Sequence, residues 1–155
     1  MVYGGAKIGI MGVLSNTILA QNGEVIGVIP KLLEKEEVLH TDVQEMIVCK
    51  TMSERKVIMS KLVDGYITLP GGFGTLDELF EALTLVQTLK VKPFPIILVG
   101  RPFWQGLVEW MQDRMVAEGC LSAAELNLFE LVGDANEAAQ VILKHIRVGE
   151  FAPNE

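Results

Sequence analysis

The stretch YITLPGGFGTLDEL, residues 66–79, decides the fold because it joins an apolar strand to a helix through a glycine-rich loop. Three glycines within four positions, Gly71, Gly72 and Gly74, let the backbone turn sharply and approach a ligand closely. The helix start that follows offers free N–H groups and the positive end of the helix dipole, which together favour a phosphate. The loop matches neither the Walker pattern nor Gly-x-Gly-x-x-Gly. A tight strand-to-helix turn without a ligand is the alternative interpretation.

Outward from this loop, short apolar runs alternate with longer helical periods, which is typical of α/β proteins with a parallel sheet. Residues 31–44 are charged and irregular, and Asp134 is the expected N-cap of the last helix. Ligands of such sheets bind outside the carboxyl ends of the strands, so the residues just after each strand are the most informative. The predicted strands are 2–3, 25–29, 46–49, 66–69, 96–99 and 129–132, and the predicted helices are 9–21, 52–63, 76–89, 104–118 and 135–146.

Glu78 has two interpretations that the sequence leaves evenly balanced. Thr75 and Glu78 fit a capping box, in which the N-cap threonine and the glutamate three residues later satisfy each other's backbone N–H groups. In that case Glu78 is purely structural. If a phosphate binds at the same helix start, an acid beside it is costly unless it takes part in chemistry.

A second functional candidate is the cation pair Arg55 and Lys56, in the first turn of the helix predicted at 52–63. Thr51 and Glu54 form a second candidate capping box at this helix start. Cations in a first helical turn oppose the dipole, so an anionic partner would explain them, and arginine suits bidentate contact. The alternative is a solvated pair that offsets Glu54. Of the methionines on this helix, Met52 and Met59 are expected to fill the core on generic grounds.

Another glycine loop follows the first predicted strand. It contains Gly4, Gly5 and Gly9 and opens the helix predicted at 9–21. This loop could receive the phosphate or ribose of a ligand, although tight packing between strand and helix explains its glycines equally well.

Composition places these segments on one acidic domain. The chain has 155 residues, a net charge of -7 and 50% hydrophobic residues. A basic face is usual for nucleic-acid binders, so the charge argues against nucleic acid as a partner. The longest apolar run, near residues 94–99, is far shorter than the roughly 20 residues of a membrane span, so we expect no membrane association. We predict a single domain over residues 1–148 and a flexible tail over 149–155.

Cysteine and histidine residues are few and scattered. Cys49 and Cys120 have no paired spacing, and both fit reduced, buried thiols in a cytoplasmic protein. His40 and His145 are isolated, so no cysteine–histidine cluster has the spacing of metal ligands. The sequence therefore predicts a cytoplasmic protein without a metal site.

Three segments together resemble the LONELY GUY family, the cytokinin riboside 5'-monophosphate phosphoribohydrolases, many of which were once labelled "possible lysine decarboxylase". Residues 70–78 match the family pattern Pro-Gly-Gly-x-Gly-Thr-x-x-Glu, residues 52–56 match Met-x-x-Arg-Lys, and residues 2–12 match the first glycine loop. The resemblance implies a Rossmann-like, doubly wound parallel sheet with helices on both faces. Ala6 stands where the family usually has a third glycine, and nothing here corresponds to the family's first strand and helix.

The resemblance also implies an activity, which is hydrolysis of the N-glycosidic bond of purine nucleoside 5'-monophosphates, such as AMP or cytokinin nucleotides, to free base and ribose 5-phosphate. By the same resemblance, Glu78 stabilises the oxocarbenium-like state and activates water, while Arg55 orients Glu78 and the ribose-phosphate end. The resemblance implies that no metal or organic cofactor is needed. The implied substrate-binding residues are Gly5, Gly9, Met52, Lys56, Gly71, Gly72, Gly74 and Thr75.

Two functions of other classes stay open at this level. Ala6 and the missing first segment favour a non-catalytic carrier of nucleotides or phosphorylated ligands on the same fold. A purely structural role within a larger assembly is the third interpretation. The family resemblance implies a homodimer or a higher homo-oligomer.

Overall fold

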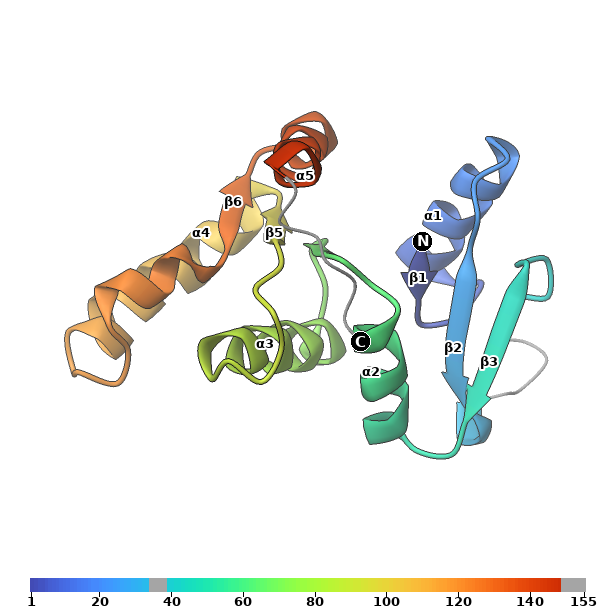
Figure 1. The fold of residues 1–155 in the computed structure, drawn as a ribbon, viewed down its shortest axis with the longest axis horizontal. Coiled ribbons are helices and arrows are strands. Elements are labelled where there is room, and N and C mark those ends of the chain that lie inside the picture. Colours follow the sequence, from blue (N-terminus) through green and yellow to red (C-terminus); the bar gives the residue numbers. More distant parts are fainter. Residues whose placement is uncertain (34–38, 149–155) are drawn as a thin grey trace. The chain divides into compact units, whose positions relative to one another are not determined.

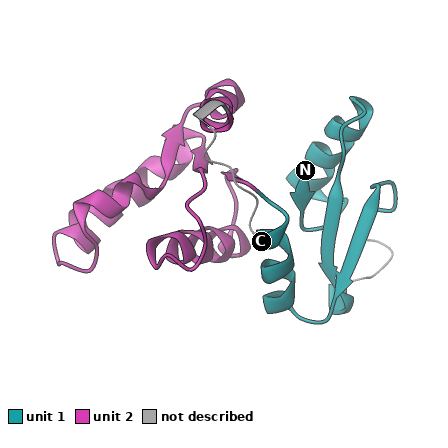
Figure 2. Cartoon of the chain, viewed as in Figure 1, with its two compact units in different colours: residues 1–63 teal, residues 64–155 magenta. Residues whose placement is uncertain are grey.

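The computed structural model describes residues 1–33 and 39–148 of the chain. Its backbone contacts divide into two compact units, Met1–Val63 and Asp64–Glu155 (Figure 2). The predicted flexible tail at 149–155 and part of the irregular segment at 31–44 lie outside the described residues. The single domain predicted over residues 1–148 stays a prediction beside this division.

Unit 1 is a parallel three-stranded sheet with order β1-β2-β3. Val2 pairs with Ile26, and Ile26 pairs with Glu45, which fixes the register of all three strands. Val28, Cys49 and Met59 form a buried cluster, so α2 covers one face of this sheet. The elements are β1 (Val2–Tyr3), α1 (Gly9–Ala20), β2 (Ile26–Pro30), the 3-10 turn η1 (Lys31–Leu33), β3 (Glu45–Cys49) and α2 (Met52–Lys61) (Figure 1).

Unit 2 is a second parallel sheet, with order β4-β5-β6. Its elements are β4 (Tyr66–Thr68), α3 (Phe73–Gln87), β5 (Ile96–Val99), α4 (Arg101–Trp110), the π-helical segment η2 (Met111–Val116), the 3-10 segment η3 (Ala123–Leu128), β6 (Glu130–Val132) and α5 (Ala135–Val148) (Figure 1).

The central strand of unit 2, β5, is buried on both faces. Ile96 and Leu98 pack with α3 and with Trp104 of α4, whereas Ile97 and Val99 pack with β6 and α5. Side chains alternate across a strand, so α3 and α4 cover one face and α5 covers the other. The predicted α/β class, with parallel strands and helices on both faces, is confirmed.

Element bounds agree with the sequence to within a few residues, with three differences. The helix predicted at 76–89 begins earlier, at Phe73, and the helix predicted at 104–118 begins at Arg101 and continues beyond Trp110 as a π-helix. The 3-10 segment η3 was not predicted, although its capping box, Ser122 with Glu125, is visible in the sequence.

The two cysteines differ from each other in exposure. Cys49 is buried as predicted, and burial raises the pKa of its thiol, which disfavours the reactive thiolate. Cys120 is exposed, so the prediction of a buried thiol is wrong there; this residue lies in the turn after η2 rather than in an element of the core. Across the described part of the chain, the helices are too short or too polar to cross a membrane.

Candidate active site

The start of α3 provides the anion-binding geometry expected after β4. Gly72 is the N-cap, with an extended backbone, and the N–H of Leu76 donates to the Gly72 carbonyl oxygen at 3.1 Å. The N–H groups of Phe73, Gly74 and Thr75 therefore precede the first intrahelical bond and lie at the positive end of the dipole. A Cβ atom on Gly72 or Gly74 would meet no atom within 4 Å, so a ligand can approach this backbone closely.

Gly71 has a different reason to be glycine. A Cβ atom at this position would overlap the side chain of Thr75, so the missing side chain leaves room for the threonine hydroxyl against the loop. The structure thus brings Gly71 and Thr75, two of the predicted binding residues, together.

The early start of α3 corrects one interpretation of Glu78. Thr75 lies within the first helical turn and Gly72 is the N-cap, so Thr75 and Glu78 do not form the N-terminal capping box of this helix. The sequence suggested otherwise because two glycines flank Phe73, and glycine has low helix propensity. Glu78 is half-buried in the second turn of α3, and the capping explanation for it is removed.

The start of α2 in unit 1 has one of the two bonds of the capping box that the sequence suggested, while the Glu54 side chain bonds one residue before the N-cap Thr51. The Thr51 hydroxyl accepts from the N–H of Glu54 at 3.1 Å, and the Glu54 carboxylate accepts from the N–H of Lys50 at 2.7 Å. Glu54 is thereby engaged with the backbone.

Arg55, the next residue, extends back to the sheet. Its Nε donates to the carbonyl oxygen of Val28 in β2 at 3.1 Å, and the residue is half-buried. This bond argues against the alternative in which Arg55 and Lys56 are a solvated pair that offsets Glu54. Lys56 is also half-buried.

The two methionines of α2 lie in different environments. Met59 is 9% exposed and belongs to the core of unit 1, as predicted. Met52 is 46% exposed at the first position of α2, so the generic prediction that it fills the core is wrong. Its exposure is compatible with the base contact that the family resemblance implies.

The first glycine loop has two glycines that require their residue type. Gly5 and Gly9 adopt φ values of 75° and 58°, in the left-handed region that glycine occupies readily. Ala6 is buried and bridges to Leu39, so its methyl group lies within unit 1 rather than at the surface of the loop.

The predicted site residues therefore fall into two sets, each described within its own unit. Unit 1 carries Gly5, Gly9, Met52, Arg55 and Lys56, and unit 2 carries Gly71, Gly72, Gly74, Thr75 and Glu78. Their roles stay predictions.

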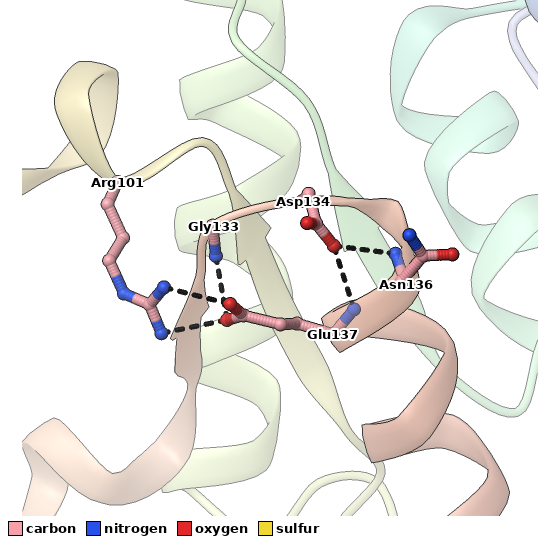
Figure 3. A network of polar contacts seen from close by, with 5 residues as sticks. All are labelled: Arg101, Gly133, Asp134, Asn136 and Glu137. Atoms are coloured by element: carbon pink, nitrogen blue, oxygen red, sulfur yellow. Dashed lines mark hydrogen bonds and ion pairs between the residues drawn. The ribbon is translucent and has the colours of Figure 1, made fainter.

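A polar network at the carboxyl ends of β5 and β6 was not predicted from the sequence (Figure 3). The Arg101 guanidinium forms a two-point ion pair with Glu137, through Nη2–Oε2 at 2.8 Å and Nη1–Oε1 at 3.2 Å. Glu137 also accepts from the N–H of Gly133 at 2.9 Å. Asp134 caps α5 as predicted, accepting from the N–H groups of Asn136 and Glu137. The sequence signal for the contact between Glu137 and the start of α5 is the three-residue spacing of Asp134 and Glu137, a variant of the capping box.

We expect this ion pair to affect the stability of the protein at acidic pH. The bond from Arg101, followed by that from Gly133, lowers the pKa of Glu137. A lowered pKa stabilises the fold above the ordinary glutamate pKa, about 4.3, and this contribution is lost as the pH falls through the lower folded value. Glu137→Gln should therefore reduce the drop in melting temperature between about pH 5 and pH 3. The exposed Glu118→Gln is the control, and an equal change in both variants would contradict the prediction.

Strands followed by glycine loops and helix starts define this protein as a Rossmann-like α/β protein. The family model described as "Possible lysine decarboxylase" matches residues 11–142. The chain belongs to the LONELY GUY family of cytokinin riboside 5'-monophosphate phosphoribohydrolases. The predicted loss of the family's first strand and helix stays a prediction.

Three relatives show the extent of the similarity. Probable cytokinin riboside 5'-monophosphate phosphoribohydrolase LOG6 of Arabidopsis thaliana is 40% identical over 153 residues, which are 99% of this chain and 73% of that protein. LOG2 of the same plant is 32% identical over 94% of this chain and 68% of its own length. The cytokinin riboside 5'-monophosphate phosphoribohydrolase of Rhodococcoides fascians is 38% identical over 80% of this chain and 63% of that protein.

A solved structure supports the fold alone. The molybdenum cofactor binding protein of Rippkaea orientalis superposes with a TM-score of 0.65 at 21% identity, covering 94% of this chain and 76% of that one.

Proposed function

We propose that this chain hydrolyses the N-glycosidic bond of cytokinin riboside 5'-monophosphates, and of AMP as the related purine nucleotide. The observation that carries the proposal is the start of α3 at Phe73, because it leaves three N–H groups for a phosphate and removes the capping explanation for Glu78. The relatives that the chain resembles over 80 to 99% of its length carry this activity in their names.

In the proposed reaction, the bond between C1' of the ribose and the base nitrogen breaks, and its electron pair leaves with the base. The oxocarbenium-like state that results is stabilised by the Glu78 carboxylate. A water molecule then adds its oxygen to C1', and its proton passes through Glu78 to the departing base. The products are the free base and ribose 5-phosphate.

The remaining residues bind the substrate and stabilise charge during the reaction. The N–H groups of Phe73, Gly74 and Thr75 hold the 5'-phosphate, while Gly71 and Gly72 let it approach the backbone. The Arg55 guanidinium stabilises the negative charge that develops as the electron pair leaves with the base. Lys56 adds positive charge on the same helix. In the proposal, Met52 contacts the base, and Gly5 and Gly9 shape the loop that receives the ribose.

The proposed reaction uses only protein groups and water. Lysine decarboxylation, which the description of the matching family model names, normally proceeds through pyridoxal phosphate bound to a lysine as a Schiff base. None of the lysines in the sequence lies in a recognisable setting for that chemistry. The hydrolytic reaction is therefore the better match to the residues of this chain.

The test is incubation of the full chain with AMP and with a cytokinin riboside 5'-monophosphate, followed by chromatography of the free base. We expect base release from the monophosphates and little from the matching ribosides, because the α3 start binds the phosphate and positions the sugar. A folded sample that releases no base from any nucleotide would overturn the proposal.

A carrier of nucleotides or phosphorylated ligands is the second candidate. It is favoured by the same helix start, whose open N–H groups can bind a phosphate without any chemistry. Calorimetry separates the two functions, since tight AMP binding without base release would establish the carrier.

A further inference from the structure

Gly4, which directly follows β1, lies against the side chain of Arg55. A Cβ atom built on Gly4 would be 2.5 Å from Nη2 of Arg55 and 3.4 Å from its Cζ. The same atom would be 3.2 Å from the sulfur of Met11 in α1. The Arg55 guanidinium therefore occupies the space that a side chain at position 4 would need.

The backbone of Gly4 does not itself require glycine. Among the described residues of unit 1, the glycines with a positive φ are Gly5 and Gly9. Gly4 is not one of them. Its conformation is thus available to any residue. A larger residue at position 4 therefore requires the neighbouring guanidinium to move, because Cβ contacts below 3.0 Å are essentially never found and the crowding atom is the far end of a flexible side chain.

A second contact fixes the same side chain from another direction. Arg55 Nε donates to the carbonyl oxygen of Val28 at 3.1 Å. Tyr3 pairs with Gly27 in the parallel register of β1 and β2, so Gly4 and Val28 are the next residues along the two neighbouring strands. Arg55 therefore reaches from α2 to both places, with its Nε bonded to Val28 in β2 and its guanidinium next to Gly4, directly after β1.

We propose that Gly4 is a positioning residue for the Arg55 guanidinium. Its catalytic consequence rests on the proposed function, in which Arg55 stabilises charge that develops during the reaction. A methyl group at position 4 would leave the charge of Arg55 in place and displace the guanidinium from its position over the end of β1. A group that must meet developing charge is sensitive to such displacement, whereas general binding of the nucleotide is less so.

The kinetic test is Gly4→Ala in the full chain, measured with AMP. We expect kcat to fall about 10²-fold, because a displacement near 1 Å can cost that much, while KM changes only a few-fold. Gly106→Ala is the matched control, since a Cβ atom there meets nothing within 4 Å in the middle of α4. It should leave kcat unchanged. Unchanged kcat in Gly4→Ala would overturn the proposal.

A double-mutant cycle shows whether Gly4 acts through Arg55. In an Arg55→Ala background there is no guanidinium to displace, so adding Gly4→Ala should cost little further activity. If Gly4→Ala lowers kcat by the same factor in both backgrounds, the effect is a general disturbance of the loop and the proposal is wrong.

An NMR measurement keeps this inference separate from the proposed function. The Nε–H resonance of Arg55 reports its bond to Val28, and we expect Gly4→Ala to shift it and to speed its exchange, with Gly106→Ala again as control. A wild-type chain without turnover would overturn the proposed function, and a shifted resonance would still support the placement of Arg55 by Gly4. An unshifted resonance would overturn that placement, whatever the activity.

Discussion

Glu78→Gln is expected to lower kcat for base release by about 10²- to 10⁴-fold, the range in which a general acid–base group contributes. The glutamine keeps the size of the side chain and loses the negative charge that stabilises an oxocarbenium-like state. It also cannot take a proton from water. Single-turnover measurement of base release is the direct readout, because it separates the chemical step from product release.

The structure makes this variant a clean test. The helix that carries Glu78 begins at Phe73 with Gly72 as its N-cap, so this glutamate does not complete the N-terminal cap. The melting temperature of Glu78→Gln should be measured beside its kcat, so that loss of the chemical step is distinguished from loss of the fold.

Asp77→Asn is the matched control for this prediction. Asp77 is the neighbouring carboxylate on α3 and is exposed, whereas Glu78 is half-buried. Its variant should retain kcat within a few-fold. If Glu78→Gln keeps full turnover, or if Asp77→Asn loses as much, the assignment of Glu78 as the catalytic carboxylate is wrong.

Arg55→Ala is expected to lower kcat by about 10²- to 10³-fold, as found when one preorganised donor to developing charge is removed. Arg55→Lys should recover only part of the loss, because an ammonium keeps the charge and lacks the planar fork of the guanidinium. Steady-state and single-turnover kinetics on the three proteins provide the comparison. Equal activity of Arg55→Lys and the wild-type protein would show that only the charge matters, contrary to the prediction.

Lys61→Ala is the control for the loss of one positive charge from α2. Lys61 is the last residue of the helix and is exposed. Its removal should leave kcat unchanged. A loss equal to that of Arg55→Ala would indicate a general electrostatic effect of the helix, and the specific role of Arg55 would then be rejected.

Strands and helices were predictable because their patterns are local. Ile96 to Val99 form a continuous apolar run, and such a run is what a strand covered on both faces requires. Asp134 could be predicted as a cap from its position before an amphipathic segment, and its two hydrogen bonds confirm this.

The start of α3 could not be placed from the sequence. Gly72 and Gly74 both suggest loop, and Thr75 with Glu78 imitates a helix start three residues too late. Which glycine is the N-cap is decided by the bond from the N–H of Leu76 to Gly72, and composition alone does not reveal that bond.

The contact between Gly4 and Arg55 was also out of reach. The two residues lie far apart in the sequence, and the periodicity that predicts a helix does not give the direction of a long side chain on it. Sequence motifs identified the first segment as a glycine loop and the second as a cation pair. Only the folded structure shows that Gly4 makes room for Arg55.

The contact between Gly4 and Arg55 constrains the order in which homologous sequences can change. A lineage that first loses the arginine frees position 4 for alanine or serine, since the crowding atom is then gone. A lineage that first replaces the glycine must instead displace a side chain that the Val28 carbonyl holds at a second point. Homologues that keep the arginine should therefore also keep glycine at position 4, and larger residues there should be found where the arginine has been replaced.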